Sequence, residues 1–412
     1  MADRTLKIAA IGVGLVVLVL GGIQVSARVK ADARVRDEIT GPAAGLSAAR
    51  KKAEALKITL PESLADEAAR TESQFTREIT SDAVLKQSFR RPSANSAEQL
   101  IRNTTFRQTL AAQTAATSSA NRVSLVSGRD ILSAPDVAMN KSMAASLATY
   151  ARQQMSQGNP SKALDALELT KELSKISGQD GHPNHLVVWF GIQLDVSRIT
   201  YEMIQADSLK GTDRARAISL LEDASDIAHL SAVVNRMTQE TVAATRVIDS
   251  FDQLELGTLN SEGRNQDPPE NHPQMKAAME TRLLEFFTEA QAISLGANNS
   301  EAAGIEVDHL LAKNHEDDSA SNYMIRTLGQ TFEQYGRMIH RVQQSRALLL
   351  AILKDLPQET KTMMIGDTLI GMDHVEVDGR HEWVAKSATA EKFLYDRPIE
   401  INQLAGVRMV IP

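Results

Sequence analysis

The 412-residue chain contains no cysteine, which excludes disulfide bonds, thiolate nucleophiles, iron–sulfur clusters and cysteine-based zinc sites. Aromatic residues are scarce at 4%, and the formal net charge of −7 is not the positive excess that nucleic-acid-binding proteins concentrate on one face. We therefore expect no nucleic-acid partner. The hydrophobic share of 42% and the charged share of 24% are typical of folded soluble domains, so a packed core is expected.

Familiar catalytic motifs are also missing. The sequence contains no HExxH, no GxSxG and no GxxxxGK[ST] pattern, and it singles out no catalytic residue and no cofactor. Two functional classes stay open. The first is a non-catalytic, membrane-anchored interaction or scaffold protein of unknown partner, and the second is a membrane-anchored or secreted enzyme with a site between a helical bundle and a C-terminal β segment. Because active sites usually leave some trace in the sequence, we favour the first class.

One long apolar run stands out in the chain. Residues 8–23, IAAIGVGLVVLVLGGI, contain no polar or charged side chain and follow the basic residues Arg4 and Lys7. Apolar side chains favour hydrocarbon, and a helix satisfies its own backbone hydrogen bonds there. The run predicts that residues 6–27 contact the membrane and that residues 1–27 form a transmembrane anchor or a signal peptide.

The length of this run does not decide between the two membrane interpretations. A spanning helix needs about 20 residues and the apolar part of a signal peptide about 7 to 15. Compact residues in Val25-Ser26-Ala27 permit cleavage after Ala27, which would release a secreted protein, but we favour an uncleaved single-pass anchor. The basic residues before the run favour an extracytoplasmic body, whereas the Lys and Arg count just after it mildly favours a cytoplasmic one. We predict an extracytoplasmic body.

Beyond residue 27 the predicted fold is mainly α, with a multi-helix bundle body and a small C-terminal β segment. Residues 257–273 contain three prolines and two glycines and show no periodic spacing of apolar residues, which is typical of a linker. The expected segments are a helical stalk or peripheral helices over 28–135, a helical bundle over 136–256, a linker loop over 257–273, long amphipathic helices over 274–356 and a small β appendage over 357–412.

Two patterns predict the bundle core. The sequence Gln157-Gly158-Asn159-Pro160 is typical of a tight turn, so the apolar stretches before and after it are expected to form an antiparallel helix pair. In residues 185–205, apolar side chains recur at steps of three and four and therefore share one stripe of a helix. This pattern predicts a central helix with Trp189 in the core. The stripe consists of Trp189, Ile192, Val196, Ile199 and Met203.

A helix predicted over 320–353 has an apolar period of 3.5 residues, which is the coiled-coil value. An ordinary bundle helix shares this geometry, and we favour it over a self-association seam. The covering helix is then expected from the same chain, over 275–293. Arg346 occupies one position of the stripe and is predicted to set the register or to lie at the rim. The stripe consists of Leu328, Phe332, Tyr335, Ile339, Val342, Arg346, Leu349 and Leu353.

Short β-type runs follow Pro357, and Asp378-Gly379 is a strong signal for a two-residue hairpin loop. A strict two-residue loop would place Val375 opposite Glu382 and would not give a clean apolar face, so the register is left open.

The same hairpin contains the metal-ligand candidates of the sequence. Alternate residues of a strand point to one face, so His374, Glu376 and His381 are expected to converge. Imidazole and carboxylate groups are zinc ligands, but this spacing matches no established zinc motif. The three residues are therefore weak candidates, and the identity of any metal is left unknown.

Overall fold

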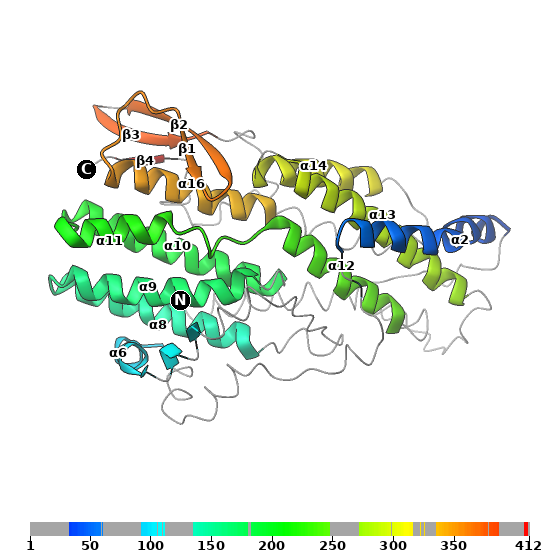
Figure 1. The fold of residues 1–412 in the computed structure, drawn as a ribbon, viewed down its shortest axis with the longest axis horizontal. Coiled ribbons are helices and arrows are strands. Elements are labelled where there is room, and N and C mark those ends of the chain that lie inside the picture. The colour runs from blue at the N-terminus through cyan, green and yellow to red at the C-terminus, as the bar shows by residue number, and fades with distance from the viewer. Residues whose placement is uncertain are drawn as a thin grey trace, which may run out of the picture.

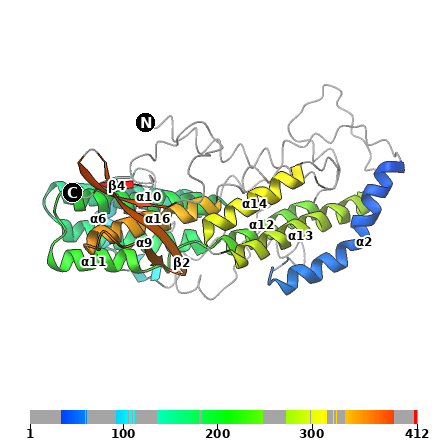
Figure 2. The same ribbon diagram turned by 90° about the horizontal axis from the view of Figure 1, so that it is seen from above.

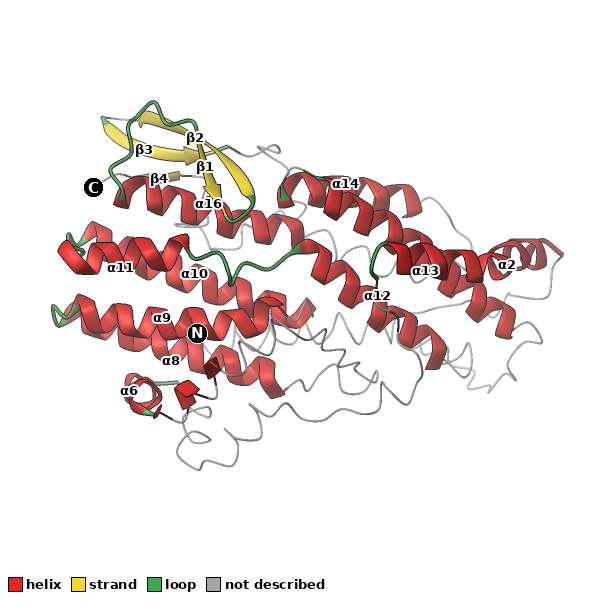
Figure 3. Cartoon of the chain, viewed as in Figure 1, coloured by secondary structure: helices red, strands yellow, loops and turns green. Residues whose placement is uncertain are grey.

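A computed structural model describes residues 33–58, 60, 92–104, 106–108, 110–111, 135–179, 183–247, 272–297, 299–315, 322, 325, 335–377, 379–386 and 408–410. The predicted membrane segment and nearly all of the predicted 257–273 linker lie outside these residues. None of the helices within them combines the length and apolar character needed to cross a bilayer. The predicted mainly helical fold with a small C-terminal sheet is confirmed (Figure 3).

The molecule is elongated, and its helices gather toward two ends (Figures 1 and 2). The sheet end contains α6 (Ala94–Arg102), α8 (Pro135–Ser156), α9 (Pro160–Gln179), α10 (Pro183–Gln205), α11 (Gly211–Glu222) and α16 (Tyr335–Leu353). The α2 end contains α2 (Ala33–Ala55), α12 (Leu230–Val247), α13 (His272–Gly296) and α14 (Ser300–His315). Helices α2 and α6 come from the predicted stalk or peripheral region, and they pack against α13 and α8 respectively.

The predicted antiparallel helix pair is formed by α8 and α9, which pack along each other. Gly158 takes the left-handed conformation in the turn, with φ of +73°, and the Asn159 amide donates to the Gln154 carbonyl at 2.9 Å. Gly158 is suited to this place because it lacks a Cβ atom. The turn signal in the sequence therefore located the hairpin correctly.

Helix α10 lies at the centre of the sheet end, where it packs against α8, α9 and α16. Trp189 is fully buried, and Val196, Ile199 and Met203 are buried on the same stripe. The predicted placement of Trp189 in the core is confirmed.

Helix α16 is described from Tyr335 onward, and every stripe position from there to its end is buried. The covering helices come from the same chain, as expected for a bundle helix, but they are α14, α10 and α11. For this described part of the stripe, the expectation that the 275–293 helix provides the cover was wrong, because that helix, α13, packs on α2, α12 and α14 instead. The stripe positions Leu328 and Phe332 lie outside the described residues. The preference for a bundle helix over self-association of two copies stays a prediction.

Two glycines explain why α14 reaches α16. The Cα atoms of Gly304 and Gly336 face each other where the helices cross, and a Cβ atom added to Gly336 would lie 2.6 Å from the Ser300 carbonyl oxygen and 2.7 Å from the Gly304 Cα atom. Such a close crossing requires the absence of side chains on both helices. An ion pair between Arg337 and Asp308 at 2.6 Å flanks it, and so does a buried polar contact of 3.2 Å between His340 Nε2 and the Glu301 carboxylate.

We expect Gly336→Ala to lower the free energy of unfolding by about 1–3 kcal/mol, the usual cost of overpacking, because the new methyl group meets backbone that cannot rotate away. Gly191→Ala on α10 is the matched control, since nothing lies within 4 Å of its added Cβ atom. That control should be neutral or stabilising, as alanine favours helix more than glycine does. Denaturant unfolding measures both, and equal midpoints for the two variants would show that the crossing is not tight.

The C-terminal residues form an antiparallel sheet of order β1-β2-β3-β4, with β1 at Thr362–Ile365, β2 at Thr368–Val377, β3 at Arg380–Ala385 and β4 at Arg408–Val410. The β2–β3 register places Val375 opposite Glu382, as the strict two-residue loop requires. Gly379 has φ of +74°, which suits this loop. The inner face packs on α16 through buried side chains that include Ile370, Met372 and Trp383.

Candidate functional site

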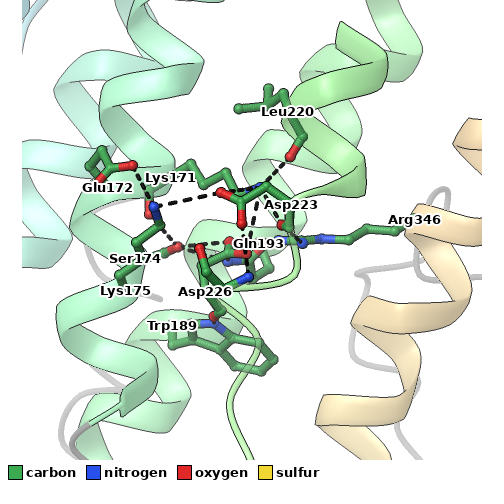
Figure 4. A network of polar contacts seen from close by, with 11 residues as sticks. Lys171, Glu172, Ser174, Lys175, Trp189, Gln193, Leu220, Asp223, Asp226 and Arg346 are labelled. Atoms are coloured by element: carbon green, nitrogen blue, oxygen red, sulfur yellow. Dashed lines mark hydrogen bonds and ion pairs between the residues drawn. The ribbon is translucent and has the colours of Figure 1, made fainter. Parts of the chain in front are cut away.

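Charged and polar side chains are buried where α9, α10, α16 and the segment between α11 and α12 meet (Figure 4). Figure 4 shows these side chains pointing toward one another from four separate parts of the chain. We call this group the buried charged cluster. It consists of Lys171, Ser174, Trp189, Gln193, Asp223, Asp226 and Arg346.

Asp226 is the centre of the buried charged cluster, and its side chain is fully buried. Its Oδ2 atom accepts hydrogen bonds from Arg346 Nη2 at 2.5 Å and from Gln193 Nε2 at 2.7 Å. The Ser174 hydroxyl lies 3.1 Å from the same oxygen. The backbone carbonyl of Asp226 accepts a hydrogen bond from the Trp189 indole at 2.6 Å. One residue between two helices thus joins α9, α10 and α16.

Lys171 satisfies the end of α11. Its ammonium group donates to the carbonyl oxygens of Leu220 and Asp223, which lie at the C-terminus of that helix. Terminal carbonyls have no partner within the helix and form the negative end of its dipole, so a buried cation is favourable there. Arg346 Nη1 donates to the Asp223 carbonyl as well, at 2.9 Å. The cluster therefore fixes the end of α11 against α9 and α16.

The charges in the cluster are unevenly matched, because two buried cations share one fully buried carboxylate. Burial lowers the pKa of Lys171, and the charge of Asp226 only partly opposes this. Burial alone would raise the pKa of Asp226, but the charges of Arg346 and Lys171 and the hydrogen bonds outweigh it, so this pKa lies below its ordinary value. The half-exposed Asp223 carboxylate, 3.3 Å from Lys171 Nζ, supplies further negative charge.

The arrangement is one that holds helices in place. Lysine and carboxylate pairs also serve acid–base chemistry, but here the side chains of Lys171, Asp226 and Arg346 are at most 4% exposed and are directed at one another. Buried ion pairs of this kind are costly to desolvate, and their best-attested role is to specify one arrangement over others. The cluster joins α16 to α9 and α10 through Asp226.

The sequence predicts a register-setting or rim residue at Arg346. The structure places Arg346 inside the cluster, bonded to Asp226 and with 1% of its surface exposed, so the rim alternative was wrong. Lys171, Gln193 and Asp226 were not predicted from the sequence. One signal could have found them, since an arginine inside an otherwise apolar stripe requires buried acceptors from elsewhere in the chain.

The metal-ligand candidates lie on the β2–β3 hairpin at the other side of α16 (Figure 1). His374 and His381 are brought together, with ring centroids 5.2 Å apart and ring planes at 22°. His374 also contacts the buried Trp383 edge to face at 5.3 Å. Glu376 is exposed directly opposite His381. Within the described part of the chain, no three histidine or acidic side chains stand together as a ready metal-ligand group.

The interface between the bundle and the sheet is the place where the alternative hypothesis puts an enzyme site. Apolar side chains of both elements fill much of it. Two glutamines of α16 tie the sheet to the bundle, Gln343 by a bond to the Thr368 hydroxyl at 2.8 Å and Gln344 by a bond to the Lys386 carbonyl at 3.0 Å. Comparisons of the chain with protein-family models, curated protein sequences and solved structures found no match.

Proposed function

We propose that the protein is a single-pass membrane-anchored helical scaffold, non-catalytic, whose extracytoplasmic body binds a protein partner. The observation that supports this most directly is the uncharged run of residues 8–23, which is followed within ten residues by the start of α2 at Ala33. An apolar run of this length is favourable in hydrocarbon and is unusual in a water-soluble helix.

The attachment of α2 to the body supports a scaffold role. The side chain of Glu280 on α13 is 5% exposed and pairs with Arg50 of α2 at 2.8 Å and with Arg246 of α12 at 2.9 Å. Ala49 and Ala53 of α2 and Ile58 just after it also form one apolar cluster with Val242 of α12 and Leu284 of α13. An anchor joined to α2 would therefore be joined to a fixed part of the body.

The elongated shape adds to the same argument. Helix α2 lies at one end of the long axis and the sheet lies at the other (Figures 1 and 2). A body held at the membrane by its α2 end would present the sheet away from the bilayer, where a partner can reach it. The alternative of an enzyme with a site between bundle and sheet stays a prediction.

Membrane fractionation tests the anchor. We expect the full chain in the membrane pellet, released by detergent and not by high salt, whereas a chain starting at Arg28 should be soluble because the apolar run is gone. Recovery of the full chain in the soluble fraction without detergent contradicts the proposal. An N-terminus found at Arg28 in cells would establish cleavage after Ala27, and a topology reporter fused after Pro412 would determine the side on which the body lies.

A further inference from the structure

Next to its loop, beyond the buried Trp383, the inner face of the β2–β3 hairpin presents two imidazoles side by side. We propose that His374 and His381 bind one divalent transition-metal ion of the zinc, copper and nickel class. Imidazole nitrogen suits these ions, whereas magnesium and calcium prefer oxygen ligands. This inference does not depend on the membrane anchor or on the scaffold function.

The strand register brings the two histidines together. Glu376 pairs with His381 and His374 pairs with Trp383, so the two imidazoles are diagonal neighbours on the same face of an antiparallel pair. The tight loop at Gly379 fixes this register. The donors are thus positioned by the backbone and by the loop, before any ion binds.

The separation of the rings suits a shared ion. Zinc binds imidazole nitrogen at about 2.0–2.1 Å, and two imidazoles on one tetrahedral ion then have their ring centroids about 5 Å apart. The observed separation is 5.2 Å. As placed, the rings are stacked at 22°, so sharing an ion requires a side chain to turn, and the exposed His381 is freer to do so than the half-buried His374.

A third ligand is within reach. Glu376 lies directly opposite His381, its side chain is exposed, and directly opposed residues have Cβ atoms about 4.5–5.5 Å apart. As placed, the three side chains do not yet form a complete ligand group, so binding requires Glu376 to rotate and water to complete the coordination. Because these rearrangements oppose binding, we expect a site of modest affinity.

Trp383 provides a local reporter of binding. The sequence contains only two tryptophans, and the other, Trp189, lies buried in the bundle. The Trp383 ring is 5.3 Å from the His374 ring, so a paramagnetic ion bound there should quench its emission. We expect Cu²⁺ to quench part of the fluorescence of the full chain in detergent, and we expect a chelator to reverse this quenching.

Substitutions identify the ligands. His381→Gln and His374→Gln should each weaken Cu²⁺ binding about 10- to 100-fold or more, since loss of even an outer-shell partner has an effect of that size. His229→Gln, at an exposed histidine before α12, is the control and should leave the titration unchanged. If His374→Gln changes the Trp383 emission by disturbing their contact, the Cu²⁺ titration of His381→Gln alone decides whether the histidines bind the ion. Quenching that survives His381→Gln at unchanged affinity, or that a chelator fails to reverse, would overturn the proposal.

Discussion

Replacing Trp189 with alanine should lower the free energy of unfolding by about 3–5 kcal/mol, the usual cost of truncating a buried aromatic side chain. The indole is fully buried on α10, and its Nε1 atom donates to the Asp226 carbonyl. Gly178 on α9 leaves room for it, because a Cβ atom there would lie 2.7 Å from the ring. The substitution would leave a cavity and also an unpaired carbonyl. Denaturant unfolding measures the change.

Two further variants separate the contributions to this loss. Trp189→Phe keeps most of the apolar volume and removes the hydrogen bond, so it should lose less than the alanine variant, with about 1–3 kcal/mol coming from the unpaired carbonyl. Val187→Ala is the control on the same helix, since Val187 is 46% exposed, and it should change stability by less than about 0.5 kcal/mol. If Trp189→Ala unfolds at the parent midpoint, α10 is not the central helix of the bundle.

The second large effect is expected for Asp226→Asn, which should cost about 3–5 kcal/mol because it leaves buried cations without their carboxylate. Asparagine matches the shape of aspartate, so the loss would reflect charge and hydrogen bonding and not volume. Asp165→Asn is the matched control. Asp165 pairs with Arg216 at 2.6 Å on the surface, where such pairs contribute at most about 1 kcal/mol.

A double-mutant cycle tests whether the cluster acts as a unit. Arg346→Met alone should also be destabilising, since it leaves the Asp226 carboxylate with one cation fewer. The double variant, Asp226→Asn with Arg346→Met, should lose clearly less stability than the sum of the two single losses. Once one member of the ion pair is removed, removing the other no longer leaves a buried charge without its partner. Additive losses would show that the two residues stabilise the fold independently.

The acid dependence of stability follows from the lowered pKa of Asp226. Because this pKa is lower in the folded chain than in the unfolded chain, the stabilisation is complete above the unfolded value of about 3.9 and is lost as pH falls below it. The parent protein should therefore lose stability on acidification through this range, and Asp226→Asn should show a shallower loss. Urea midpoints between pH 5 and pH 3 measure the difference.

Local signals in the sequence were enough to predict some features of the fold. Gly158 and Gly379 adopt left-handed backbone conformations, and the turn and the hairpin loop that contain them lie at the positions predicted from the sequence. The core stripe around Trp189 depends on helix periodicity alone. Such features require no knowledge of which distant segments meet.

The features that could not be predicted from the sequence depend on contacts between residues that lie far apart in the chain. The crossing of α14 over α16 depends on the close approach of Gly304 and Gly336, and nothing local in the sequence indicates that these glycines face each other. The cluster residues were missed for the same reason. Arg346 was visible as a charged residue in an apolar stripe, but its carboxylate partner is 120 residues earlier, in a short connection between helices.

That separation has a consequence for the order in which the protein is made. Asp226 leaves the ribosome 120 residues ahead of Arg346, an interval of about 6 to 24 s at synthesis rates of about 5–20 residues per second. During this time α9, α10 and α11 can pair, but their shared centre holds a carboxylate and a lysine that still need water. We expect the nascent chain to keep that centre open until α16 emerges, and to present it, with its apolar surroundings, to chaperones for those seconds.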